Sequence, residues 1–189
     1  MDKQRTICFT GLRPKKLFGY QDCTQYHTIS HTLGIFLQLL YDHGYHAFLS
    51  GGAQGFDQLA FWTVHRQLPT AENHVYIPFP QQSERWEPDG LFGQKNYQRM
   101  LDLATSVTDI SQGATTVSDK QCSPYLHKRN RSMVDHSAAT IALYPHDRKV
   151  WTDQGGTAAC IRYSLTQQHP VLCLDPFTCN WAVWERTNQ

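Results

Sequence analysis

The chain has 189 residues, of which 40% are hydrophobic and 17% charged, and its formal net charge is +1. A chain of this size can bury one substantial core, so we expect a single domain over residues 1–189. The near-neutral charge disfavours a protein built mainly to coat nucleic acid, and there is neither an apolar leader after Met1 nor an apolar run long enough for a membrane-spanning helix; we therefore expect a soluble, cytoplasmic protein.

Patterns typical of strands and helices alternate along the chain. Buried strands are predicted at 6–9, 46–49, 75–77, 106–110, 140–144 and 171–174, and helices at 26–43, 56–67, 94–104, 128–137 and 157–168. The polar stretch 111–124 is expected to be a loop, and residues 175–189 a flap packed on the domain. The alternation predicts an α/β fold, a Rossmann-like three-layer sandwich in which helices cover both faces of a mostly parallel sheet.

The cysteines and histidines give no sign of a cross-linked or metal-bound fold. None of the six cysteines forms a Cys-x-x-Cys pair, and several lie in apolar strand or helix patterns. The ten histidines are scattered, without a metal-binding spacing. We therefore expect buried free thiols and no metal site.

The most informative motif is the glycine-rich segment Ser50-Gly51-Gly52-Ala53-Gln54-Gly55-Phe56-Asp57, which connects a predicted strand to a predicted helix. Glycines at such a turn let the backbone approach a ligand, and the free amides of the first helical turn attract an anion. The motif indicates a phosphate-binding turn, although glycines also serve simply to fit the chain between two elements.

Two further turns of the same kind follow other predicted strands. Thr10-Gly11-Leu12-Arg13-Pro14 ends the first strand, and Gly155-Gly156-Thr157 opens the last helix. In an open α/β sheet, ligands bind beyond the carboxyl ends of the strands, where all three turns would meet.

Five motifs in order resemble the YpsA-like family of the SLOG superfamily. They are the Thr10–Pro14 turn followed by Lys16-Leu17, the Ser50–Asp57 turn, Pro78-Phe79 with Trp86 downstream, the run from Arg129 to Asp135, and Gly155-Gly156-Thr157. The resemblance covers about residues 6–174. This Rossmann-like superfamily also holds the LOG phosphoribohydrolases and the DprA DNA-processing domain, and it implies a nucleotide or nucleotide-derived, ADP-ribose-like ligand.

The resemblance and the three turns together give the candidate ligand-binding residues. Arg13 suits a bidentate phosphate contact or, alternatively, covers the sheet edge. Asp57 would accept hydrogen bonds either from a ribose or from backbone amides of an adjoining turn, and Thr157 would cap its helix and bond a phosphate. The full set is Thr10, Gly11, Arg13, Ser50, Gly51, Gly52, Gly55, Asp57, Arg129, Asn130, Arg131, Gly155, Gly156 and Thr157.

The helix that begins near Arg129 adds further candidates, each with two possible roles. Either Arg129 or Arg131 would reach a phosphate or form part of a solvated basic helix start, and Asp135 would pair with one of them. Trp86 and Tyr97 would stack on a base or, with about twice the weight, serve the core or a lid.

Two departures from the family patterns bear on activity. Leu12 stands where the family usually has a histidine, and no glutamate follows Gly155-Gly156-Thr157 as it does in the LOG signature. We therefore expect a nucleotide-binding sensor or regulatory protein. The alternatives are a LOG-like enzyme of the N-glycosidic bond, with an acid at Glu84, Glu87, Asp89 or Asp135, and a DprA-like binder of single-stranded DNA. A nucleic-acid partner is disfavoured by charge, no membrane partner is expected, and a homodimer is compatible with the sequence.

Overall fold

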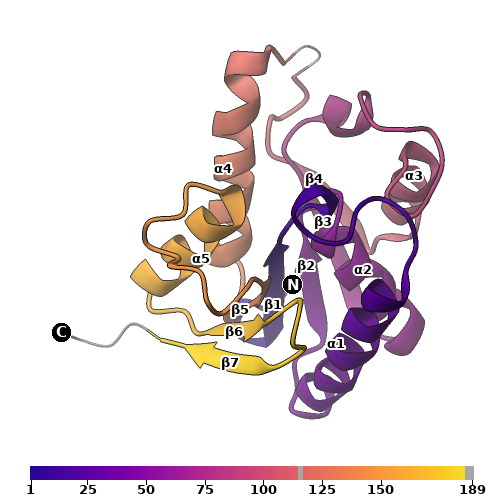
Figure 1. Ribbon diagram of the computed structural model, residues 1–189. Helices are drawn as coiled ribbons and strands as arrows, with labels where there is room; N and C mark the ends of the chain where they lie inside the picture. The colour runs from indigo at the N-terminus through magenta and orange to yellow at the C-terminus, as the bar shows by residue number, and fades with distance from the viewer. Residues whose placement is uncertain (115–116, 186–189) are drawn as a thin grey trace.

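The computed structural model describes residues 1–114 and 117–185. Its strands are β1 (Thr6–Gly11), β2 (Ala47–Ser50), β3 (Glu72–Ile77), β4 (Ser106–Asp109), β5 (Ala139–Leu143), β6 (Val171–Leu174) and β7 (Trp181–Trp184). They form one sheet in the order β4-β3-β2-β1-β5-β6-β7 (Figure 1). All neighbouring strands are parallel except β6 and β7. The predicted α/β fold with a mostly parallel sheet is confirmed.

Five helices cover the sheet: α1 (Thr24–Asp42), α2 (Phe56–Gln67), α3 (Gln94–Leu103), α4 (Asp119–Asp135) and α5 (Gly156–Thr166). Short 3-10 helices lie at η1 (Lys3–Arg5), η2 (Pro14–Lys16) and η3 (Pro80–Ser83). Figure 1 shows α4 and α5 on one side of the sheet and α1, α2 and α3 on the other.

The strand alternation explains this division into layers. Ile7 and Phe9 of β1 pack in one buried cluster with α1 and α2, whereas Cys8, between them, packs in another with α4 and α5. Successive side chains of a strand point to opposite faces, so a strand that is apolar at every position must be covered on both sides. The continuous apolar run at the start of the chain therefore becomes a central strand.

The order of the strands creates a switch point between β1 and β5. From β1 the chain proceeds through α1 to β2 on one side, whereas from β5 it proceeds through α5 to β6 on the other. The two connections leave in opposite directions, which opens a crevice outside the carboxyl ends of these strands.

Helix α4 is longer than the sequence patterns indicate. It begins at Asp119, so its first turns occupy part of the segment 111–124 that was expected to be a loop, of which residues 115–116 lie outside the described ranges. A capping box starts it: the Ser118 amide donates to Oε1 of Gln121 at 3.0 Å. The helix continues through Pro124 even though proline lacks the amide for an intrahelical bond.

The predicted flap is a strand. Within 175–185, β7 pairs antiparallel with β6, with Leu174 opposite Trp181 and Val171 opposite Trp184. The reversal is fixed by the Asp175 carboxylate, which accepts hydrogen bonds from the amides of Phe177 and Thr178. Residues 186–189, which belonged to the same prediction, lie outside the described ranges.

The cysteines of the protein are all free, and Cys8, Cys160 and Cys173 are buried as expected. Burial raises the pKa of the Cys160 thiol to about 12. None of the helices in the described ranges has the length and apolar character needed to cross a membrane.

Candidate functional site

A cleft of about 260 Å³ lies at the carboxyl edge of the sheet, at the switch point between β1 and β5. Its walls come from the end of β1 with η2, from α4, and from the loop that leads into α5. Nine of the predicted residues line it: Thr10, Gly11, Arg13, Asp57, Arg129, Asn130, Gly155, Gly156 and Thr157. The topology thus brings together residues from four distant parts of the sequence.

The end of β1 and the start of α5 are joined directly. The Thr157 hydroxyl donates to the carbonyl of Gly11 at 2.7 Å. The N-cap of α5 is Gly155, which offers no side-chain cap, so the expectation that Thr157 caps the helix is wrong. Its hydroxyl instead fixes the distance between the two glycine turns.

The first turn of α5 faces the cleft with its backbone amides. The first hydrogen bond of the helical ladder runs from the Ala159 amide to the Gly155 carbonyl at 3.0 Å, so the amides before Ala159 have no acceptor within the helix. A Cβ added at Gly156 would meet no other atom within 4 Å, so there is open space beside this residue. Free amides at the positive end of a helix dipole attract an anion.

Asp153 holds the loop before α5 in place. Its carboxylate accepts hydrogen bonds from the Tyr144 hydroxyl at 2.7 Å and from the Gly155 amide at 2.9 Å. These two bonds, with Lys16 nearby, lower the pKa of the Asp153 carboxyl below its usual range. The aspartate is therefore an anion that is already engaged by the protein.

Arg129 and Asp57 form a buried ion pair at the floor of the cleft. Nη1 of Arg129 lies 3.6 Å from Oδ2 of Asp57, and the same nitrogen donates to the Gly51 carbonyl. Asp57 also accepts from the Ala53 amide at 3.3 Å. The sequence suggested that Asp57 accepts hydrogen bonds either from a ribose or from backbone amides of an adjoining turn, and the bond from Ala53 is of the second kind.

Burial acts on both members of this pair. It raises the pKa of the Asp57 carboxyl and lowers that of the Arg129 guanidinium, and the attraction between the two groups opposes both shifts. The two opposite charges neutralise each other, so the pair forms the floor of the cleft and adds no net charge to it.

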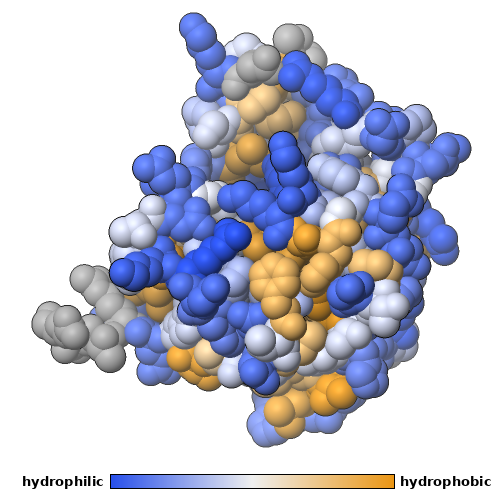
Figure 2. Space-filling model, in the orientation of Figure 1, coloured by the Kyte–Doolittle hydropathy of each residue, from blue (hydrophilic) through white to orange (hydrophobic). Residues whose placement is uncertain are grey.

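Three cations at the rim have no such partner. Arg13, Lys15 and Lys16 line the cleft, and in the described ranges none of them forms an ion pair. Figure 2 shows hydrophilic side chains gathered over the space between α5 and the segment that follows β1. The rim therefore carries net positive charge beside the first turn of α5.

The serine-glycine turn reaches the cleft only through Ala53 and Asp57. Ser50, Gly51, Gly52 and Gly55 do not line the cleft. The Ser50 hydroxyl donates to the Asp57 carbonyl at 2.9 Å and accepts from the Gly52 amide at 3.2 Å, so both of its roles are internal. Gly55 has a φ of +97° and lies against the backbone of Leu12. In this structure the turn positions the Asp57 side chain.

Four other side chains discussed above also lie outside the cleft. The Arg131 guanidinium lies over the Tyr163 ring, 5.5 Å from its centroid, and the Tyr163 hydroxyl donates to Asp135 at 2.8 Å. Trp86 and Tyr97 pack edge to face at 5.0 Å, and Tyr97 is buried. The two aromatic residues therefore belong to the core, and Asp135 bonds a tyrosine in place of the expected arginine.

The sequence analysis missed four polar residues that line the cleft: Lys15, Lys16, Tyr144 and Asp153. The lysines directly follow Arg13-Pro14, so three basic residues within the four positions after the glycine turn are the signal that would have found them. Tyr144 follows a buried strand, and Asp153 precedes Gly155 in a polar loop. Within the described ranges, no group of three His, Cys, Asp or Glu side chains is placed to hold a metal ion.

Comparison with known proteins gives matches of three kinds. The model of the YspA SLOG family matches residues 7–178. An uncharacterized SPbeta prophage-derived protein of Bacillus subtilis, YoqJ, is 30% identical over 140 residues, which cover 70% of this chain and 77% of that protein. Among solved structures, DNA processing protein A from Helicobacter pylori, which binds single-stranded DNA, is similar with a TM-score of 0.56 at 16% identity, over 100% of this chain and 68% of that one.

Proposed function

Because the chain belongs to the YspA SLOG family, with a basic cleft at the switch point of its sheet, we propose that it binds a nucleotide or a nucleotide-derived, ADP-ribose-like ligand there. In this proposal the protein acts as a sensor or regulator, and ligand binding is read out through a conformational change or a partner. The family and the Rossmann-like fold support nucleotide binding in general, and the rim chemistry favours a phosphate-bearing ligand.

The single observation that carries the proposal is the meeting of Arg13, Lys15 and Lys16 with the first turn of α5. Cations outside ion pairs and the amides of Gly156 and Thr157, which have no acceptor within the helix, favour an anion site, because each contributes positive charge or a donor. A phosphate or diphosphate matches this donor set, since its oxygens accept several hydrogen bonds at once.

The remaining residues take supporting roles. Arg13 would bind a phosphate through its planar guanidinium, and the backbone amides of Gly156 and Thr157 would bond the phosphate oxygens. Gly155 lines the wall, and its amide donates to Asp153. Thr10, Gly11 and Asn130 would complete the wall. Arg129 and Asp57 would hold the floor rather than touch the phosphate, because they already satisfy each other.

An N-glycosidic hydrolase is the first alternative, and the cleft chemistry disfavours it. Both carboxylates that line the described cleft, Asp57 and Asp153, already accept hydrogen bonds from the protein. A general acid needs a transferable proton near neutral pH, and the lowered pKa of Asp153 keeps that group ionised. Burial raises the pKa of Asp57, but this carboxyl is held in the ion pair with Arg129. Glu87 and Asp89, which were proposed as replacement acids, line a different cavity.

Single-stranded DNA is the second alternative, supported by the likeness of the fold to Helicobacter pylori DNA processing protein A. That likeness is one of fold at 16% identity, and the formal net charge of this chain is only +1. A local basic rim of three cations is compatible with one phosphate group or with a strand of several, so affinity must be measured for both.

One experiment separates the three functions. The purified protein is screened by thermal shift against mononucleotides, dinucleotides, ADP-ribose and single-stranded oligonucleotides, and each mixture is then analysed by chromatography for free base. Saturable stabilisation by an intact nucleotide supports the sensor. Released base assigns an enzyme, a steep salt dependence of oligonucleotide affinity assigns a DNA binder, and no shift with any of these compounds contradicts the proposal.

A further inference from the structure

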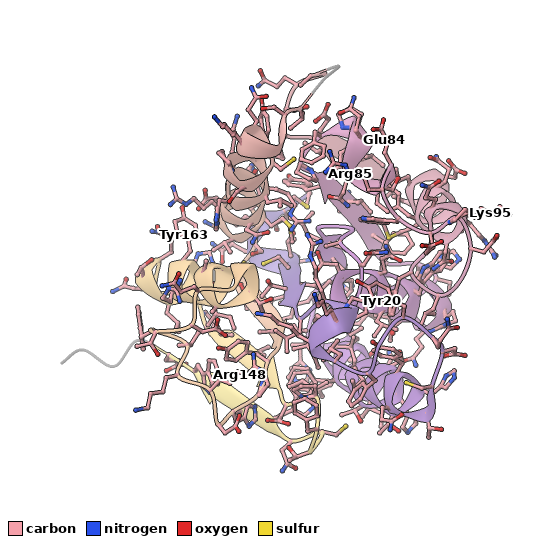
Figure 3. All side chains as sticks on the ribbon, turned by 45° about the horizontal axis from the view of Figure 1, so that its top comes forward. Tyr20, Glu84, Arg85, Lys95, Arg148 and Tyr163 are labelled. Atoms are coloured by element: carbon pink, nitrogen blue, oxygen red, sulfur yellow. The ribbon has the colours of Figure 1, made fainter. Side chains whose placement is uncertain are left out.

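A second hollow, of about 460 Å³, lies along the seam between α4 and α5 and adjoins the cleft. We call it the α4/α5 groove; it is lined by His127 and Arg131 of α4, by Arg162 and Tyr163 of α5, and by Trp151 of the loop before α5. Figure 3 labels Tyr163 at the outer side of the molecule, beside α4 and α5. Asn130 lines both the groove and the cleft, so the two hollows are neighbours that meet at this residue.

The groove presents aromatic rings together with cations. Trp151 is 59% exposed, although a tryptophan side chain is costly to leave in water. The Arg131 guanidinium lies over the Tyr163 ring, whose hydroxyl is fixed by Asp135. Exposed aromatic faces beside arginines are the surface on which nucleobases stack, since every base has a π-face.

The loop that carries Trp151 is anchored on both sides of that residue. Nη1 of Arg162 donates to the carbonyl of Val150 at 2.5 Å and to that of Asp153 at 2.6 Å. Asp153 in turn binds Tyr144 and the Gly155 amide. An aromatic platform held in place loses little conformational entropy when a ligand stacks on it.

The dimensions connect the groove with the phosphate site. The cleft, at about 260 Å³, is smaller than the roughly 300–1,000 Å³ typical of pockets for drug-sized ligands. A nucleotide with its phosphates at the first turn of α5 therefore extends beyond the cleft. Gly156 of the cleft and Tyr163 of the groove are seven residues apart and so lie on one face of α5, about 10 Å apart along its axis, a length that a ribose with its phosphates spans.

From these observations we propose that the α4/α5 groove is the nucleobase subsite: the base stacks on Trp151 while the phosphates lie in the cleft. This inference rests on the proposed function, and it specifies a phosphorylated nucleoside rather than a sugar phosphate or a free phosphate. Asn130 marks the junction, since its side-chain amide donates to the Gly156 carbonyl at 3.4 Å.

The test compares ADP with pyrophosphate, which lacks the nucleoside, by isothermal titration of the wild type and of Trp151→Ala. We expect ADP to bind the wild type more tightly than pyrophosphate does, and Trp151→Ala to weaken ADP about tenfold while leaving pyrophosphate unchanged. Trp151→Phe, which keeps an aromatic face, should restore most of the ADP affinity. Phe177→Ala is the matched control, because Phe177 is equally exposed at 59% and packs on Phe18.

The outcomes distinguish this inference from the proposed function. If both compounds bind and Trp151→Ala binds ADP as the wild type does, the base subsite is overturned while the phosphate site stands. If Phe177→Ala weakens ADP as much as Trp151→Ala, the effect is not specific to the groove and the inference is again overturned. If neither compound binds the wild type, the proposed function fails and the base subsite fails with it.

Discussion

Nη1 of Arg129 lies 3.6 Å from Oδ2 of Asp57, and each side chain is only 7% exposed. The pair joins helix α4 to the start of α2 across the end of the sheet, and it occupies the place where the sequence suggested a phosphate contact and a ribose contact. A buried charge is tolerated only when its partner is present, so each residue depends on the other.

Replacing Arg129 should therefore destabilise the fold strongly. Arg129→Met leaves the Asp57 charge buried without a partner, which we expect to lower the free energy of unfolding by about 3–5 kcal/mol. Denaturation with urea measures the change. Arg131→Met, two residues further along the same helix and outside the cleft, is the control and should change it by less than about 1 kcal/mol. Similar values for the two variants would show that the buried pair is not structural.

Replacement by alanine should change the free energy of unfolding at Gly55 more than at Gly156. Gly55 has a φ of +97°, and a Cβ there would lie 2.5 Å from the carbonyl oxygen of Leu12. We expect Gly55→Ala to lower the free energy of unfolding by about 1–3 kcal/mol. At Gly156 a Cβ meets nothing within 4 Å, so Gly156→Ala should stay within about 1 kcal/mol of the wild type. Equal losses in thermal or urea unfolding would contradict the close approach at Gly55.

The contribution of Asp153 to stability should depend on pH. Its hydrogen bond from Tyr144 lowers the pKa of the folded-state carboxyl below the unfolded value of about 3.9. The contribution is therefore present above that pH and is lost as the pH falls through the folded-state pKa. We expect Tyr144→Phe to be less stable than the wild type by about 1–2 kcal/mol at neutral pH.

Below a pH of about 4 this difference should shrink, because a protonated Asp153 gains less from the Tyr144 hydroxyl, which only the wild type has. Urea unfolding of both proteins across the acidic range measures it. A difference that stays constant through that range would mean that the hydroxyl acts through contacts other than the carboxylate.

Strand β7 should contribute to stability through Trp181. The Trp181 ring stacks on Phe36 of α1 with the centroids 4.3 Å apart, and it is part of the pairing with β6. We expect Trp181→Ala to lower the free energy of unfolding by about 2–3 kcal/mol, because it removes a half-buried aromatic side chain. Val183→Ala is the control, since Val183 lies on the same strand and is 62% exposed. A negligible effect of Trp181→Ala would show that β7 is a loosely held flap.

Most of the sheet could be predicted from the sequence, including the edge strand β4, but the other edge strand, β7, could not. The central strands carry short apolar runs, Ile7-Cys8-Phe9 in β1 and Ile141-Ala142-Leu143 in β5, which indicate parallel strands covered on both faces. The last strand, Trp181–Trp184, is half-exposed and antiparallel, and its pairing depends on a turn made by the Asp175 carboxylate. Such a long-range pairing leaves no periodic signal in a segment of four residues.

The start of α4 could not be predicted for a different reason. Pro124 and the polar residues around it favour a loop, whereas the capping box between Ser118 and Gln121 starts a helix. The helix packs on α5 and the sheet through its later turns, where Met133 and Val134 are buried. The capping box and this packing together decide the conformation against the preference of Pro124 and its polar neighbours.

For the site, the sequence indicated which turns meet but not which atoms face the space between them. The glycine turns at Gly11 and Gly155 line the cleft as predicted, because both follow or precede elements at the switch point. The turn at Ser50 also connects a strand to a helix through glycines, yet the Ser50 hydroxyl bonds only to backbone groups of the same turn. Only the three-dimensional packing distinguishes a turn that faces a ligand from a turn that supports it.

The most direct test of the account is isothermal titration with ADP-ribose of the wild type, Arg13→Ala and the control Lys95→Ala, whose lysine pairs with Asp89 away from the cleft. We predict saturable binding that weakens about tenfold in Arg13→Ala, stays unchanged in Lys95→Ala and weakens as the salt concentration rises. If ADP-ribose does not bind, or if it binds Arg13→Ala as tightly as the wild type, the cleft is not the phosphate site that this account requires.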